Sequence, residues 1–86
     1  MIDAPAGWTN DGRSLERVFD RKTFDGSIAF VNAVAAAANR LNHHPDITIA
    51  WNTVTIRTWS HDVSAITDRD VALANAINAL ADPKNP

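Results

Sequence analysis

The sequence predicts a small α+β domain in which one antiparallel sheet carries helices on a single face. Two strand-like stretches, residues 7–20 and 46–59, are each followed by a stretch with helical spacing of apolar residues. A strong Asp-Gly turn signal at residues 11–12 divides the first stretch into a hairpin. Two hairpins and two helices in the order β-β-α-β-β-α can form one four-stranded sheet. The chain of 86 residues suits one domain with one core, so we expect a single domain over residues 1–86.

The longer predicted helix runs from Phe24 to Asn42. Apolar residues recur there at helical spacing, and alanines fill the positions between them. Thr23 or Asp25 can serve as the N-cap residue. Pro45 ends the pattern, because the residue before a proline is disfavoured in helical geometry.

The second hairpin predicts a register as well as two strands. A tight turn at Asn52-Thr53 would place Ile49 opposite Ile56. This register puts six side chains on one face, as a half-buried hairpin requires. The six residues are Ile47, Ile49, Trp51, Val54, Ile56 and Thr58.

Continued beyond the strands, the same register brings all three histidines to one edge of the sheet. His44 would lie opposite His61, with Cβ atoms about 4.5–5.5 Å apart, and His43 adjoins His44. Asp46 and Trp59 would form the neighbouring pair on a polar face. Imidazole, with an ordinary pKa of about 6.5, can donate or accept a proton at neutral pH. The cluster therefore predicts an acid–base site.

Several of these residues also have a purely structural interpretation. A histidine at a helix C-terminus, such as His43, is often a favourable partner of the helix dipole. Trp59 fits an interface as well as a ligand platform. Asp70, three residues after Thr67, completes a capping box at the start of the second helix. On residues alone we assign Asp70 to the cap. Asp70→Asn should then lower stability slightly and keep most turnover, and His61→Ala should do the reverse.

Metal binding is a further alternative that the sequence disfavours. Adjacent His43 and His44 do not easily point at one ion in regular geometry. The chain has no cysteine, and the nearby carboxylates are those of Asp46 and Asp62. We therefore expect no metal.

Composition excludes other classes of function. The net charge is −2, the isoelectric point is near 5.8, and the eight basic residues are scattered, so there is no basic face for nucleic acid. No apolar run approaches the roughly 18–20 residues of a membrane span. The N-terminus lacks the pattern of a secretory signal, so we expect a cytoplasmic protein. Without disulfides to support a small core, we expect self-association.

The spacing of the polar residues resembles the signature of the pterin-4a-carbinolamine dehydratases. The resemblance extends from Gly7 to about Ala81 and so covers nearly the whole chain. The positions that carry it are Asn42-His43-His44-Pro45-Asp46, Trp51-Asn52, His61 and Thr67-Asp68-Arg69-Asp70.

This resemblance implies a fold and a reaction. The fold is a four-stranded antiparallel sheet with helices on one face, assembled as a homodimer or homotetramer, with the usual N-terminal helix short or absent here. The reaction removes water from a 4a-hydroxytetrahydropterin to give a quinonoid dihydropterin, without metal or cofactor. Such dehydration belongs to tetrahydrobiopterin recycling, which implies an aromatic amino acid hydroxylase in the same pathway.

The resemblance also assigns residues to roles. The implied catalytic residues are His43, His44 and His61. The implied substrate-binding residues are Asn42, His43, His44, Trp59, Ser60, His61 and Asp62. Asp70 and Asn39 are expected to support the site.

One position departs from the family pattern. Four residues before His43 the family carries a charged residue, whereas this chain has Asn39. If a carboxylate at this position orients or charges His43, the amide that replaces it can still hydrogen-bond to His43 but does not stabilise its imidazolium. Reduced activity and a moved pH profile would follow. A binding or dimerisation module that acts through a protein partner is therefore the alternative function.

Overall fold

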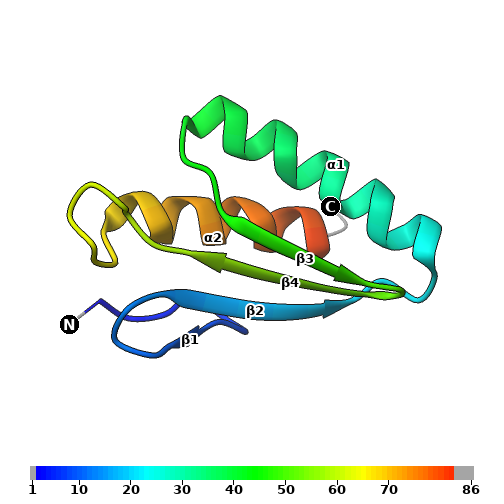
Figure 1. Cartoon of the computed structure of the whole chain (residues 1–86), viewed down its shortest axis with the longest axis horizontal. Helices are drawn as coiled ribbons and strands as arrows, with labels where there is room; N and C mark the ends of the chain where they lie inside the picture. Colours follow the sequence, from blue (N-terminus) through cyan, green and yellow to red (C-terminus); the bar gives the residue numbers. More distant parts are fainter. Residues whose placement is uncertain (1, 83–86) are drawn as a thin grey trace.

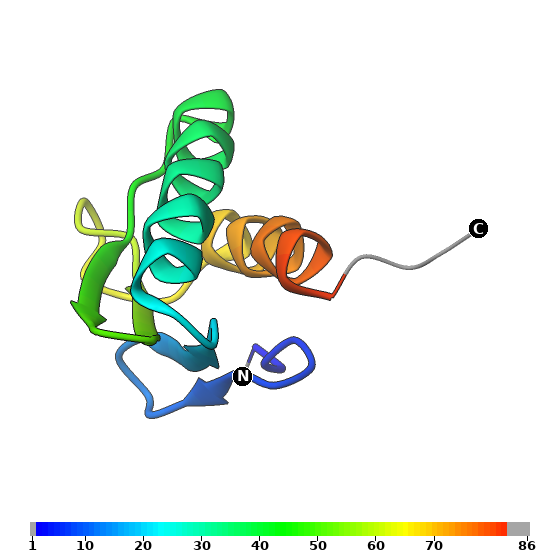
Figure 2. The same ribbon diagram turned by 90° about the vertical axis from the view of Figure 1, so that its right-hand side faces the viewer.

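The computed structural model describes residues 2–82 and contains a four-stranded antiparallel sheet with two helices on one face (Figures 1 and 2). The strands are β1 (Thr9–Asn10), β2 (Leu15–Asp20), β3 (Asp46–Ala50) and β4 (Thr53–Thr58), and the helices are α1 (Phe24–Leu41) and α2 (Asp68–Ala81). The strand order is β1-β2-β4-β3, so the two hairpins join through β2 and β4. The predicted fold class and element order are confirmed.

Capping residues set both ends of α1. Thr23 is the N-cap residue, and its side chain accepts a hydrogen bond from the backbone N–H of Gly26 (2.9 Å). Asn42 ends the helix in the left-handed conformation, with φ of 52°. Asparagine tolerates this conformation better than most residues, because its short side chain bonds locally. The reversal at Asn42 turns the chain from α1 toward the sheet and places His43 between them.

The core lies between the sheet and the helices. A buried aromatic group forms one end of it, with the rings of Trp8 and Phe19 6.1 Å apart and those of Phe19 and Phe30 4.9 Å apart. Val54 and Ile56 on β4 are fully buried beneath the helices. The opposite face of the sheet is uncovered in the described chain (Figure 2). Neither helix of residues 2–82 has the length and apolar character needed to cross a membrane.

The β3–β4 hairpin differs from the predicted register by two residues. Ile49 pairs with Val54 and Ile47 with Ile56, whereas the sequence predicted Ile49 opposite Ile56. A shift by an even number of residues keeps every side chain on its own face of the sheet. The strand assignment is therefore correct while the cross-strand partners are wrong.

The predicted pairs at the histidine end are wrong for the same reason. Asp46 pairs with Arg57, not with Trp59. The ladder ends at Asp46, so His44 and His61 are not cross-strand partners. The two residues lie instead in the segments just before β3 and just after β4, and both line one cleft.

Contacts of the turn explain the shift. The turn is centred on Trp51 and Asn52, one residue earlier than predicted. The buried Ser27 hydroxyl donates to the Trp51 carbonyl (2.7 Å), and the Arg21 backbone N–H donates to the Asn52 carbonyl (2.7 Å). Trp51 lies at the turn with φ of 54° and is 74% exposed, so it is not one of the inward-facing side chains.

This register can be tested by disulfide formation on the open face, since the chain has no cysteine of its own. Thr48 and Thr55 are direct partners, and opposed Cβ atoms lie about 4.5–5.5 Å apart. The double variant Thr48→Cys/Thr55→Cys should oxidise readily. Thr48→Cys/Arg57→Cys places the cysteines on a diagonal, at about 7–8 Å, and should stay reduced. The reverse result, scored by thiol titration, would restore the register predicted from the sequence.

Candidate active site

The three histidines line one cleft at the end of the sheet where α1 ends and β4 runs into the loop of residues 61–64. The cleft has a volume of about 370 Å³. Its lining residues are Asn42, His43, His44, Trp59, His61, Asp62 and Arg69. The structure thus brings together the predicted site residues except Ser60, Asp70 and Asn39, which lie behind the lining or beside it.

His43 is the buried histidine of the cleft. The residue is 8% exposed, and its backbone N–H donates to the Ala38 carbonyl (3.1 Å) just after the helix reversal. Its ring Nε2 lies 2.6 Å from Oδ1 of Asp70. Helix α1 therefore fixes the backbone of His43, and the first turn of α2 supplies the partner of its ring.

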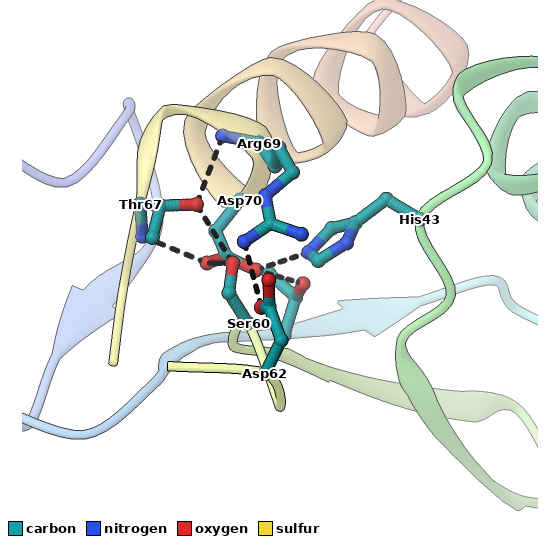
Figure 3. A network of polar contacts seen from close by, with 7 residues as sticks. His43, Ser60, Asp62, Thr67, Arg69 and Asp70 are labelled. Carbon is teal, nitrogen blue, oxygen red and sulfur yellow. Dashed lines mark hydrogen bonds and ion pairs between the residues drawn. The ribbon is translucent and has the colours of Figure 1, made fainter. Parts of the chain in front are cut away.

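Asp70 is the centre of a polar network beneath the cleft (Figure 3). Its side chain is fully buried. Oδ1 accepts from the Thr58 hydroxyl (2.6 Å) and faces His43. Oδ2 accepts from the Ser60 hydroxyl (2.9 Å) and from the Thr67 backbone N–H (2.9 Å). Each carboxylate oxygen thus has two partners, and the four come from three segments of the chain: the junction of α1 with β3, the end of β4 with the residues after it, and the start of α2.

These contacts determine the ionisation of Asp70. Burial alone would raise the pKa of the carboxyl, but the hydrogen bonds from Thr58, His43, Thr67 and Ser60 together outweigh burial and lower the pKa below its ordinary 3.8. Asp70 is therefore a carboxylate at neutral pH. A carboxylate only accepts hydrogen bonds, so Nε2 of His43 carries a hydrogen and donates it. In the neutral ring this leaves Nδ1 as the atom that can accept a proton.

The capping role predicted for Asp70 is confirmed but incomplete. The N-cap residue of α2 is Thr67, and the reciprocal capping box with Asp70 is present. The contacts to His43 and Thr58 were missed, because local sequence spacing reports only on the helix that a residue caps. The available signal was a pair of hydroxyl residues, Thr58 and Ser60, at the inner positions that lead out of a buried strand.

Asn39 supports a different histidine from the one predicted. Its Oδ1 lies 3.0 Å from Nε2 of His44, an exposed side chain at the rim. The carboxylate partner of His43 is Asp70 instead. The expectation that an amide at position 39 deprives His43 of its charge partner is therefore wrong.

The outer wall of the cleft is formed by the segment after β4. The His61 ring packs edge-on against Trp59, with ring centroids 4.3 Å apart. Asp62 accepts a hydrogen bond from the Arg69 guanidinium (2.7 Å), which lowers the pKa of its carboxyl. This ion pair links the loop to the first turn of α2 (Figure 3). His61 itself is exposed to solvent.

Ser60 does not face the cleft as a binding residue would. It is fully buried, and its hydroxyl contacts Asp70 and Oγ1 of Thr67 (2.7 Å). Its hydroxyl holds Asp70, and a substrate contact of Ser60 stays a prediction. Within residues 2–82, no three histidine, cysteine or acidic side chains are grouped so as to hold a metal ion.

Comparison with known proteins assigns this arrangement to a family. Residues 1–80 match the sequence profile of the family described as pterin 4 alpha carbinolamine dehydratase. The chain belongs to this family. A relative from Thermosynechococcus vestitus, named "Putative pterin-4-alpha-carbinolamine dehydratase", is 48% identical over 87% of this chain and 79% of its own. A relative of the same name from Thermomicrobium roseum is 44% identical over 94% of this chain and 87% of its own.

Two solved structures have a similar fold. One is described as a transcriptional coactivator/pterin dehydratase from Brucella melitensis, with a TM-score of 0.81 and 29% identity over 88% of this chain and 83% of its own. The other is described as a pterin dehydratase-like protein that is a RuBisCO assembly factor in the alpha-carboxysome. It has a TM-score of 0.72 and 22% identity over 90% of this chain and 89% of its own, which shows the shared fold alone.

The lowered pKa of Asp70 predicts a pH dependence of stability. A group whose pKa falls on folding stabilises the protein above its ordinary value, here 3.8, and loses that contribution as pH falls through the folded pKa. The urea midpoint should drop on acidification below about pH 4 in the natural protein, and the drop should be smaller in Asp70→Asn. Asp68→Asn, an exposed neighbour in the same helical turn, should keep the full drop. Parallel curves for the natural protein and Asp70→Asn would contradict the ionised, buried Asp70.

Proposed function

We propose that this protein is a 4a-hydroxytetrahydropterin dehydratase that works by histidine acid–base catalysis. The observation that carries the proposal is the His43–Asp70 pair, buried at the floor of a cleft that His44 and His61 also line. Family membership supplies the reaction class. The reaction needs one proton donor and one proton acceptor. The cleft supplies three imidazoles in different surroundings, each of which can donate or accept a proton.

Two proton transfers accompany the loss of water. The bond from carbon 4a to the hydroxyl oxygen breaks, and that oxygen leaves as water after taking a proton. The hydrogen on the neighbouring ring nitrogen, N5, departs as a proton, and its electron pair forms the new double bond to carbon 4a. General acid–base catalysis of this kind contributes about 10²–10⁴-fold in rate.

His43 is the proton acceptor in this proposal. Its Nε2 is committed to Asp70, so Nδ1 receives the proton from N5 of the pterin. The carboxylate stabilises the imidazolium that forms, as an opposite charge within hydrogen-bonding distance does. Asp70 acts through His43 and is therefore a positioning residue.

His61 is the proton donor and His44 a binding residue in the same proposal. The exposed His61 can regain its proton from solvent after each turnover. The half-buried Trp59 beside it offers a ring for stacking the flat pterin. His44 is oriented by Asn39, which leaves its second ring nitrogen to hydrogen-bond the substrate.

The alternative of a binding module acting through a protein partner has less support. The printed descriptions of the two solved structures include a coactivator and an assembly factor, which are statements about those proteins. In this chain the argument for the alternative was Asn39, and that residue contacts His44 rather than His43. Self-association as a dimer or tetramer, a cytoplasmic location and a tetrahydrobiopterin pathway stay predictions.

Stopped-flow dehydration of freshly generated 4a-hydroxytetrahydropterin tests the proposal. His43→Ala and His61→Ala should each lower the turnover rate by about 10²–10⁴-fold. Asp70→Asn should also lower turnover, in contrast to the expectation from sequence alone, because the variant removes the charge beside His43. Asp68→Asn is the matched control and should keep the rate of the natural protein.

Two results would count against the proposal. A natural protein that dehydrates the substrate no faster than buffer would exclude the enzyme. Full turnover in Asp70→Asn, with a lowered urea midpoint, would restrict Asp70 to its cap.

A further inference from the structure

A second pocket shares Trp59 with the histidine cleft. Its volume is about 430 Å³. We refer to it as the arginine pocket, and its lining residues are Arg13, Ser14, Arg57, Trp59 and Ser64. Trp59 lines both hollows, so the two are neighbours.

The lining groups of the arginine pocket are suited to an anion. Two guanidinium groups and the Ser64 hydroxyl can donate hydrogen bonds to a ligand, whereas the buried Ser14 hydroxyl is occupied by Arg57 and Asp11. None of the lining side chains is a carboxylate. Guanidinium groups match the geometry of carboxylate and phosphate oxygens. This chemistry contrasts with the histidine cleft, which includes Asp62 in its wall.

Arg57 is held in place from within the protein. Its Nε donates to the buried Ser14 hydroxyl (2.8 Å), and its guanidinium lies over the Trp59 ring, 5.7 Å from the centroid. The side chain is nevertheless 45% exposed. With Nε bonded to Ser14 and Nη2 in only a long contact with Asp11 (3.4 Å), Nη1 is the nitrogen available to a ligand.

Asp11 is the acidic group that faces this arginine, and it is largely occupied elsewhere. Its Oδ1 accepts from the backbone N–H groups of Arg13 and Ser14, both at 2.8 Å. These bonds lower the pKa of its carboxyl by stabilising the ionised form. Its contact with Arg57 is long (3.4 Å) and half-exposed, which is a weak ion pair. The carboxylate of Asp11 therefore balances only part of the positive charge of Arg13 and Arg57.

We propose that the arginine pocket binds a carboxylate or phosphate at the end of the substituent carried by the pterin in the histidine cleft. The substrate would then be a 4a-hydroxytetrahydropterin with an anionic side chain. This inference rests on the proposed function for the placement of the pterin ring. The shared wall at Trp59 favours two parts of one ligand over two separate ligands.

The test is equilibrium binding of oxidised pterins, which do not dehydrate, so that binding is measured apart from turnover. Calorimetric titration compares 6-hydroxymethylpterin with its phosphate monoester and with pterin-6-carboxylate. The two anionic ligands should bind about threefold to tenfold more tightly than the neutral one, the range for two half-exposed charge pairs. The preference should shrink with added salt, because exposed charges are screened. The two anionic ligands also show which anion the pocket prefers.

Variants then assign the preference to the pocket. Arg13→Gln and Arg57→Gln each remove one positive charge and should each bring the ratio of neutral to anionic dissociation constants closer to one. Arg13 is exposed, and its side chain makes no hydrogen bond within residues 2–82, so Arg13→Gln should fold even if Arg57 variants do not. Lys22→Gln removes one positive charge at the far end of β2, beyond Asp20, and should leave the ratio unchanged.

Three outcomes would overturn the inference. The first is equal affinity for neutral and anionic pterins. The second is a preference for anionic pterins that survives in both arginine variants. The third is binding of inorganic phosphate or an acidic peptide to the arginine pocket without displacement of the anionic pterin. Dehydration of neutral substrates without any charge preference would leave the proposed function intact. A charge preference in binding without turnover of any substrate would support the pocket and contradict the proposed function.

Discussion

A carboxylate with no access to solvent is stable only if hydrogen-bond donors surround it, because an unpaired buried charge costs several kcal/mol. Asp70 meets this condition with two partners on each oxygen. The partners belong to the end of β4 with the residues after it, the start of α2 and the junction of α1 with β3. One side chain thus caps α2, joins three segments of the chain and orients His43.

This constraint explains why three histidines in one cleft are not equivalent. His43 is buried and fixed by a carboxylate, whereas His44 and His61 are exposed and differ in their neighbours. A buried ring beside a permanent charge suits proton acceptance, and an exposed ring suits exchange with water. The surroundings of each ring, rather than its residue type, therefore separate the roles. Trp59 lines both the cleft and the arginine pocket, in which we propose that a ligand places its ring and its anionic substituent.

Much of the fold could be predicted from local patterns. The helical spacing, the Thr23 cap, the Thr67–Asp70 capping box and the alternation in β3 and β4 all depend on residues close in sequence. The register of the second hairpin could not, because the turn position depends on a hydrogen bond from Ser27 on α1 to Trp51. The convergence of the histidines was predicted correctly from an incorrect register, since a two-residue shift changes partners but not the end of the sheet.

The buried network could not be predicted either, since its members lie up to 27 residues apart. Within this network, Asp70 fixes the ring hydrogen of His43 on Nε2. The direct measurement is nitrogen-15 NMR of the histidine rings at neutral pH, with the ring hydrogens observed in water. The Nε2–H tautomer of His43 should dominate, with a slowly exchanging, strongly deshielded Nε2 hydrogen that disappears in Asp70→Asn. A His43 ring with its hydrogen on Nδ1, or with the same spectrum in Asp70→Asn, would contradict this account.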